Sequence, residues 1–217
     1  MPSSRVAASA PPRVTARRQA TRDRVLEAAS EVFAERGFHG ATVEEICERA
    51  GFTRGAFYSN FSSKDDLVVE LSRRHSEALV DRIRRASKGA HTTADDLLRD
   101  VFAALADDSR SQERWLVLTT EFTLHAIRDA DARRAWATQQ HRVRDELVAV
   151  VDEAVARQGL ALPMPTELFV RAAIALAQGS MAQRLIEPRS LRVGELERTV
   201  LPILLGLGGR ATASSVQ

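Results

Sequence analysis

A short polar helix carries the residues of this sequence that are best suited to contacting another molecule. In the segment TRGAFYSNF, which ends at Phe61, helical spacing turns Phe57 and Phe61 inward. The side chains left on the outside are small or polar and include one cation and one phenol. These outward residues are Arg54, Gly55, Tyr58, Ser59 and Asn60.

The preceding segment predicts a partner helix and a tight turn. Thr42 and Glu45 have the spacing of a capping box, so a helix is expected to begin directly after Thr42. Gly51 stands where a left-handed cap would end this helix, and Thr53 can cap the next one. Two such helices are typical of a helix-turn-helix, which reads DNA. They also occur in all-α proteins that never touch nucleic acid, so spacing alone leaves both interpretations open.

The remaining chain predicts an all-α fold of about nine helices, because no segment alternates with period 2. The first helix is expected to begin at Thr21 and to end at Gly37. A helix from Lys64 to about residue 86 would be about 33 Å long, enough to bridge two domains. Thr166 is expected to cap a later helix. The further helices are expected at about 93–107, 111–127, 131–158, 166–187 and 193–207.

Composition indicates a globular protein with unevenly distributed charge. The chain has 217 residues, of which 44% are hydrophobic, and this is enough for a sizeable core. A formal net charge of only +2 argues against indiscriminate coating of nucleic acid. Residues 1–20 are rich in Ala, Pro, Ser and Arg and predict a disordered basic arm. Such an arm either contacts DNA phosphates or a minor groove, or is a solvated tail.

The sequence lacks the patterns on which common enzymes depend. A single cysteine, Cys47, excludes an internal disulfide and a multi-cysteine metal site, and the histidines lack metal-ligand spacing. There is no nucleophile elbow, glycine-rich phosphate loop or H-E-x-x-H motif. We therefore expect no enzyme, no catalytic residue, no cofactor and no metal. The alternatives are an all-α enzyme or an interaction protein whose helix-turn-helix only packs. Without a membrane span or signal peptide, a soluble cytoplasmic protein is expected.

The first helix and the segment ATVEEICERAGFTRGAFYSNFSSKDDLV resemble the TetR/AcrR family of transcriptional regulators. The resemblance covers about residues 21–70, and beyond it only the layout of helices is similar. It implies a helix-turn-helix domain at 21–66, a ligand-binding and dimerisation domain at 67–210 and a tail at 211–217. The pattern that carries the resemblance consists of Phe57, Tyr58, Phe61, Lys64, Asp65 and Leu67.

The resemblance also implies individual DNA-binding residues. Thr42 and Thr53, at two helix starts, match phosphate binders, as do Tyr58 and Lys64. Arg54 is the candidate for direct base readout, because a guanidinium can bond guanine O6 and N7 together. Gly55 departs from the larger residue that is common in the family, which makes a base contact there less certain. The remaining candidates are Ala56 and Ser59 on the base-reading face and Asn60 beside the DNA backbone.

A homodimer and a small-molecule effector are further implications. The family pairs its last two helices between subunits, and both are rich in apolar residues here. The expected interface residues are Ala173, Ala177, Met181, Leu196, Val200 and Leu204. The middle helices would enclose a cavity for a mostly apolar effector that releases a repressor from a near-palindromic operator. For each candidate below a place in the core is the stronger interpretation, because aromatic residues at helical spacing more often belong to a core than to a pocket wall. The candidates are His75, Phe102, Trp115, Thr119, Phe122, His125, Trp136, Gln140 and Phe169.

Overall fold

The structure, a computed structural model, describes residues 16–89, 91–106 and 109–207. Within these residues the chain forms nine helices and no strand, so the predicted all-α class is confirmed. In chain order the helices are α1 (Ala16–Gly40), α2 (Val43–Ala50), α3 (Arg54–Tyr58), α4 (Lys64–Ser87), α5 (Ala94–Ala106), α6 (Ser109–Arg128), α7 (Ala130–Arg157), α8 (Thr166–Ile186) and α9 (Glu195–Leu204). Across the same ranges, no helix is long and apolar enough to cross a membrane.

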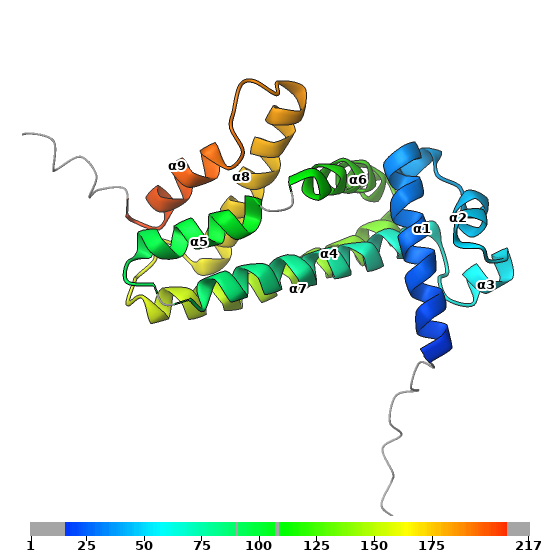
Figure 1. Cartoon of the computed structure of the whole chain (residues 1–217), viewed down its shortest axis with the longest axis horizontal. Coiled ribbons are helices and arrows are strands. Elements are labelled where there is room, and N and C mark those ends of the chain that lie inside the picture. Colours follow the sequence, from blue (N-terminus) through cyan, green and yellow to red (C-terminus); the bar gives the residue numbers. More distant parts are fainter. Residues whose placement is uncertain (1–15, 90, 107–108, 208–217) are drawn as a thin grey trace, which may run out of the picture.

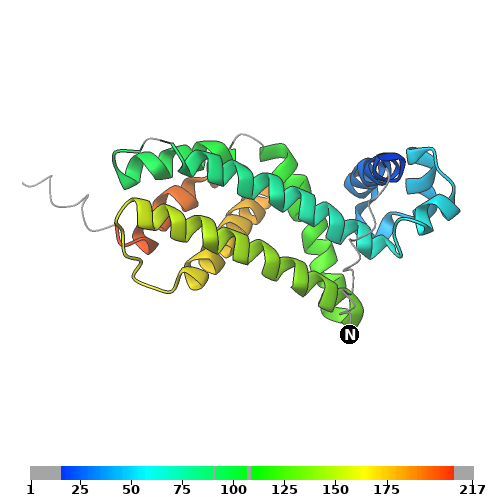
Figure 2. The same cartoon turned by 90° about the horizontal axis from the view of Figure 1, so that it is seen from below.

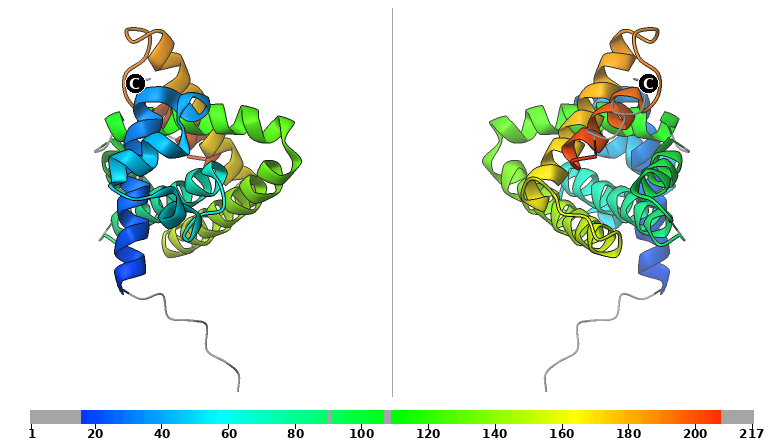
Figure 3. Two further views of the ribbon diagram at one scale, coloured as in Figure 1. Left: turned by 90° about the vertical axis from the view of Figure 1, so that its right-hand side faces the viewer. Right: turned by 90° about the vertical axis from the view of Figure 1, so that its left-hand side faces the viewer.

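The helices are arranged along one long axis. Helices α1, α2 and α3 gather at one end, and α5, α8 and α9 lie toward the other (Figure 1). Helices α4 and α7 run side by side along the axis and connect the two ends (Figure 2). Figure 3 shows the molecule from both ends of this axis, and in each view α6 and α7 meet at a sharp turn at one side. In the right-hand view α8 and α9 are nearest the viewer. Because α4 follows α3 directly, it can transmit displacements between the ends.

Local signals fix the geometry of the two short helices. The Thr42 hydroxyl accepts from the Glu45 amide and the Glu45 carboxylate accepts from the Thr42 amide, so the predicted capping box is confirmed. Gly51 ends α2 with φ 71° and ψ 34°, a left-handed conformation that favours glycine. The Thr53 hydroxyl accepts from the Ala56 amide and caps α3. The turn between the helices therefore follows from residues that are adjacent in sequence.

Two predicted helix boundaries and one predicted cap differ from the structure. Helix α1 begins at Ala16 rather than Thr21, so residues 16–20 are helical and do not belong to an arm. Residues 1–15 and the predicted tail lie outside the described part of the chain. Helix α3 ends at Tyr58, whereas the sequence predicted a helix from Arg54 to about Asn60. Thr166 does not cap α8, because Pro165 holds the cap position and the Thr166 hydroxyl donates to Asp152 at 2.5 Å.

The main hydrophobic core is shared between the small helices and the long ones. The side chains of α1, α2 and α3 pack in one cluster with Leu67 and Val68 of α4. The same cluster includes Phe122 of α6 and Trp136 of α7. The predicted domain boundary at residue 66 falls in the first turn of α4, where packing is continuous. Helix α6 therefore anchors the first three helices to the body of the protein.

Candidate nucleic-acid interface and ligand cavity

The outer face of α3 is open to solvent as the sequence predicted. The side chain of Arg54 is 59% exposed and Tyr58 is 50% exposed, whereas Phe57 is completely buried. Gly55 and Ser59 are also exposed. The buried ring of Phe57 holds the helix against the core, and the polar side chains are free to meet a surface that approaches from outside.

Arg54 is held in place by an acid that the sequence analysis did not identify. Its Nη1 lies 2.5 Å from Glu44 Oε1, and its guanidinium carbon lies 5.8 Å from the centre of the Tyr58 ring. Glu44 lies on the exposed face of α2. Its predicted position on that face was the only feature of the sequence that could have indicated this ion pair. The predicted base contact of Arg54 would require the guanidinium to leave this carboxylate.

The two threonines differ in what they can offer a phosphate. Both donors of Thr42, its amide and its hydroxyl, bond to the Glu45 carboxylate at 3.0 Å. These bonds hold the pKa of Glu45 below its usual value, the amide contributing more than the hydroxyl. A phosphate at Thr42 would meet this negative charge, so the structure favours capping over the predicted phosphate contact. The Thr53 hydroxyl accepts a bond from Ala56, a role that leaves its hydrogen available to donate.

Lys64 has a structural role that the prediction of a phosphate contact missed. Its Nζ donates to the carbonyl oxygens of Phe38 at 2.6 Å and Ala41 at 2.9 Å. The ammonium also lies 4.5 Å from the centre of the Phe38 ring. Burial lowers the pKa of Lys64. The side chain joins the start of α4 to the connection between α1 and α2, because these carbonyls end a helix and need donors.

Arginines of α1 hold the carboxyl ends of the two short helices. Arg18 Nη2 donates to the Ser59 carbonyl at 3.0 Å, and Arg22 Nη1 donates to the Asn60 carbonyl at 2.6 Å. Arg24 Nη2 donates to the last carbonyl of α2 at 2.9 Å. Cations at these positions complement the partial negative charge of a helix end. The i, i+4 spacing of Arg18 and Arg22 was the signal for these contacts, but Arg18 was assigned to the basic arm and Arg22 only to the first helix.

The side chain of Asn60 also contacts Arg18 and the backbone of α3. Its Nδ2 donates to the Ala56 carbonyl at 2.8 Å, and its Oδ1 lies 3.4 Å from Arg18 Nε. Asn60 and Ala56 are both partly buried. The predicted contacts of these two residues with DNA therefore remain predictions, and the exposed reading face is narrower than expected.

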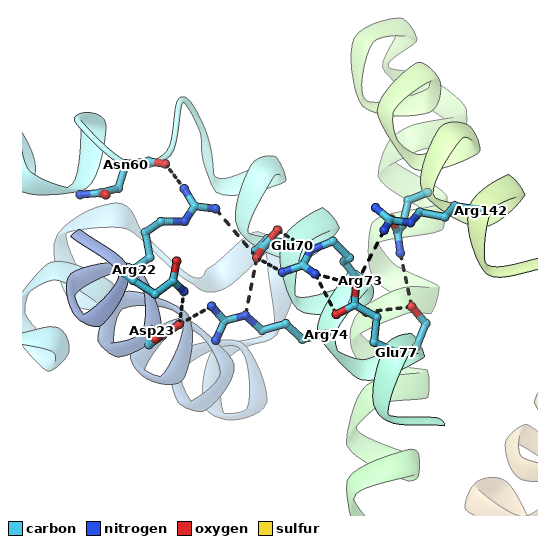
Figure 4. A network of polar contacts seen from close by, with 11 residues as sticks. Arg22, Asp23, Asn60, Glu70, Arg73, Arg74, Glu77 and Arg142 are labelled. Carbon is cyan, nitrogen blue, oxygen red and sulfur yellow. Dashed lines mark hydrogen bonds and ion pairs between the residues drawn. The ribbon is translucent and has the colours of Figure 1, made fainter. Parts of the chain in front are cut away.

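A network of ion pairs leads away from this end of α3 (Figure 4). Glu70 of α4, whose side chain is 18% exposed, accepts from Arg73 Nη2 at 2.7 Å and from Arg73 Nε at 3.0 Å. The same carboxylate lies 3.6 Å from Arg74 and 3.9 Å from Arg22. Burial acts to raise the pKa of Glu70, but the bond from Arg73 and the surrounding positive charges outweigh it and lower that pKa. Glu70 therefore stays ionised between three arginines.

The network continues along α4 to α7. Arg73 Nη1 donates to Glu77 at 2.6 Å, and Glu77 lies 3.9 Å from Arg142 of α7. Figure 4 shows these side chains as a continuous row between the two helices. The row connects the carbonyl after α3 with the helix pair that spans the molecule.

Several predicted ligand contacts instead form the junction between α6 and α1. Phe122 is completely buried, with its ring centre 5.1 Å from those of Phe38 and Trp136. Glu121 accepts from the Phe38 amide at 2.5 Å, and His125 Nε2 lies 3.0 Å from Asp65. Phe122 and His125 of α6 therefore pack against Phe38 of α1, whereas Trp115 stacks on His75 of α4 with ring centres 4.7 Å apart. The predicted contacts that do not line the cavity described below are His75, Trp115, Thr119, Phe122, His125, Trp136 and Gln140.

A cavity of about 230 Å³ lies at the other end of the molecule. Helices α4, α5, α7, α8 and α9 contribute to its wall, and Phe102 and Phe169 line it as predicted. Ala173 and Ala177, which were predicted to lie at a dimer interface, also line it. Leu204 packs in the hydrophobic cluster beside it. These three residues face the interior because the inner side of α8 and α9 closes the protein's own core.

The described residues form an N-terminal helix-turn-helix and, at the other end of the molecule, a separate apolar cavity. Residues 25–71 match the family of bacterial regulatory proteins known as the tetR family. This match confirms, over residues 25–71, the resemblance that the sequence showed. Within the described residues, no cluster of His, Cys, Asp or Glu is arranged to hold a metal ion.

The similar proteins of known name include both a transcriptional activator and a transcriptional repressor. The chain is 42% identical to the HTH-type transcriptional activator FasR of Mycolicibacterium smegmatis over 82 residues, which are 38% of this chain and 36% of the relative. It is 31% identical to the HTH-type transcriptional repressor AcnR of Corynebacterium efficiens over 130 residues, which are 60% of this chain and 63% of the relative. The chain thus spans less than two thirds of the length of these relatives.

A solved structure shows the same fold over most of the chain. Salmonella enterica GusR superposes with a TM-score of 0.68 and covers 86% of this chain and 96% of its own. Its sequence is 23% identical, so this likeness establishes the fold alone.

Proposed function

We propose that this protein is a ligand-responsive transcriptional repressor that binds a near-palindromic operator as a homodimer in the cytoplasm and acts by binding rather than by catalysis. The observation that carries the proposal is the exposed face of α3 behind a capped α2 and a glycine turn. The match of residues 25–71 to the tetR family of regulatory proteins supports it. Arg54 would read a base edge, while Tyr58 and Thr53 would hold the phosphates on either side.

DNA binding can be tested with matched arginine variants. Footprinting on the DNA that flanks its own gene would identify an operator, and fluorescence anisotropy would then give affinities. Arg54→Ala should weaken operator binding about tenfold and relax discrimination at one base pair. Tyr58→Phe should weaken matched and mismatched sites alike. Arg49→Ala is the control, because Arg49 pairs with Glu35 of α1 and lies away from the reading face.

Two outcomes would contradict this assignment. The first is an affinity of Arg54→Ala for the operator that equals that of Arg49→Ala. The second is an identical loss on matched and mismatched sites for Arg54→Ala and Tyr58→Phe, which would mean that Arg54 contributes only charge.

The dimer surface that we propose differs from the predicted one and uses the outer side of α8 and α9. On α8 the exposed positions include Leu168, Ala175 and Ile186, and on α9 they include Ile203. A Cβ atom at Gly179 would meet nothing within 4 Å, so this side of α8 has room for a close helix neighbour. A two-fold axis here would present two α3 helices to half-sites about 34–36 Å apart.

Sedimentation velocity tests the dimer surface. Ala175→Glu should shift the protein toward monomer, because a carboxylate would be buried between paired helices. The control is Ala137→Glu, which places the same charge at an exposed position of α7. A dimer that is equally stable in both variants would exclude this side of α8.

Ligand binding in the cavity would release DNA because α4 and α7 connect the cavity with the helix-turn-helix. Helices α4 and α7 supply cavity-lining residues, among them Leu79 and Val150. They also carry the ion pairs of Arg73 with Glu70 and Glu77, and the pair of Glu77 with Arg142. A ligand that separates α4 from α7 would therefore shift α3 relative to its partner copy. The expected coupling free energy is about 1–3 kcal/mol.

A further inference from the structure

The chemistry of the cavity wall restricts what it can hold. Almost all of the lining side chains are hydrocarbon, drawn from Leu, Val, Ile, Ala and Phe residues of five helices. The polar exceptions in the wall are Ser87 and Glu197. No lysine, arginine or histidine belongs to the lining. An anionic group inside would therefore lose its hydration without gaining a cation.

Both polar side chains of the wall already have partners in the protein. The Ser87 hydroxyl donates to the Arg84 carbonyl at 3.1 Å. The Glu197 carboxylate accepts from the hydroxyl of Ser180, which is 2% exposed, at 3.2 Å. The first bond lies within α4 and the second joins α8 to α9, and the two groups present almost no polar surface to the cavity. Recognition there must come from burial of apolar surface and from shape.

We infer that the cavity binds the hydrocarbon chain of a neutral aliphatic molecule and discriminates against carboxylates. This inference rests on the proposed ligand-responsive function and specifies its ligand. A cavity of about 150 Å³ in another protein accommodates benzene, so one of about 230 Å³ accommodates roughly nine carbon atoms in proportion. Glu197 reinforces the discrimination, because its charge repels an anion at the wall.

A series of straight-chain alcohols from butanol to dodecanol tests the inference by isothermal titration calorimetry. Each added methylene should tighten binding about fourfold. The gain should cease beyond roughly nine carbons, where the chain outgrows the cavity. Dissociation constants that do not change with chain length, or no detectable binding by any alcohol, would overturn the inference.

Charge provides the second arm of the test. Decanoate should bind at least tenfold more weakly than decanol, and Glu197→Gln should narrow that ratio by removing the repulsion. Decanoate binding as tightly as decanol to the native protein would overturn the inference.

Cavity-filling variants locate the binding site. Ala177→Phe should weaken decanol binding at least tenfold by occupying the cavity, and Ala173→Val should weaken it less and serves if the larger change prevents folding. Ala103→Phe is the control, because Ala103 is exposed on α5 next to the cavity-lining Phe102. Equal decanol affinity in Ala173→Val, Ala177→Phe and Ala103→Phe would place the alcohol elsewhere and refute the site.

Operator binding measured on the same samples separates this inference from the proposed function. If decanol binds as expected but leaves operator affinity unchanged, the ligand class is supported and ligand-induced release is refuted. If the operator is bound but no alcohol is, the ligand class is refuted and DNA binding stands.

Discussion

Replacement of Glu70 by glutamine is the perturbation with the best-defined consequence, because this carboxylate is the centre of the ion-pair network. Glu70→Gln keeps the shape of the side chain and removes its charge. Two bonds from Arg73, at 2.7 and 3.0 Å, lose an ionised acceptor, and the amide group brings its own N–H donors toward the guanidinium. The attraction to Arg74 and Arg22 is lost as well.

The magnitude follows from the burial of the pair. Hydrogen bonds to charged groups contribute about 1.5–3 kcal/mol each, and glutamine can replace one of the two with a neutral acceptor. Because the Glu70 side chain is only 18% exposed, solvent compensates little. We expect the free energy of unfolding to fall by about 2 kcal/mol, which corresponds to a melting temperature lower by about 4–8 °C for a chain of this size.

Urea unfolding followed by circular dichroism, at a fixed protein concentration, measures this difference. The control is Glu77→Gln. The Glu77 side chain bonds the same Arg73 but is 40% exposed, so this variant should lose less than about 1 kcal/mol in the free energy of unfolding. A Glu70→Gln protein as stable as the native one at pH 7 would refute the reasoning.

The pH dependence gives an independent check on the same residue. The pKa of Glu70 is lowered in the folded protein, because hydrogen bonding and positive charge outweigh the opposing effect of burial. Its stabilising contribution is therefore complete above the ordinary glutamate pKa of about 4.3 and is lost as the pH falls through the folded-state value. The stability difference between native protein and Glu70→Gln should be equal at pH 7 and pH 5.5 and should shrink below about pH 4. A difference that grows on acidification would contradict the assigned sign.

Three further changes test the positions around the reading unit. Lys64→Met should lower the free energy of unfolding by about 2 kcal/mol, because the carbonyls of Phe38 and Ala41 lose their donor. A Lys64→Met protein that loses DNA affinity but no stability would instead support the predicted phosphate contact. Phe122→Ala should cost about 3–5 kcal/mol in thermal or urea unfolding, since the ring is completely buried, and a loss below 1 kcal/mol would show that the α1–α6 junction is loose. Thr42→Ala should cost about 1 kcal/mol through the lost cap, and hydrogen exchange should locate the loss in α2 rather than spread it over the molecule.

Sequence alone was sufficient for features that depend on neighbours along the chain. The capping box at Thr42, the left-handed turn at Gly51 and the cap at Thr53 each involve residues within a few positions of one another. The burial of Phe57 beneath an exposed Arg54 follows from helical period in the same way. The helix-turn-helix was therefore predictable from local chemistry, and the family pattern confirmed its type.

Only the tertiary structure decided which partner each long side chain has. Lys64 was equally suited by sequence to a phosphate or to the carbonyls 23 and 26 residues earlier that it contacts. Phe122 lay on an apolar stripe that could have faced either a cavity or α1, and Ala177 could have faced either a second copy or the protein's own interior. Helical period determines that such residues lie on one face, but the crossing of distant helices determines what that face meets. This is why the helix-turn-helix could be located from the sequence, whereas the residues that line the cavity could not.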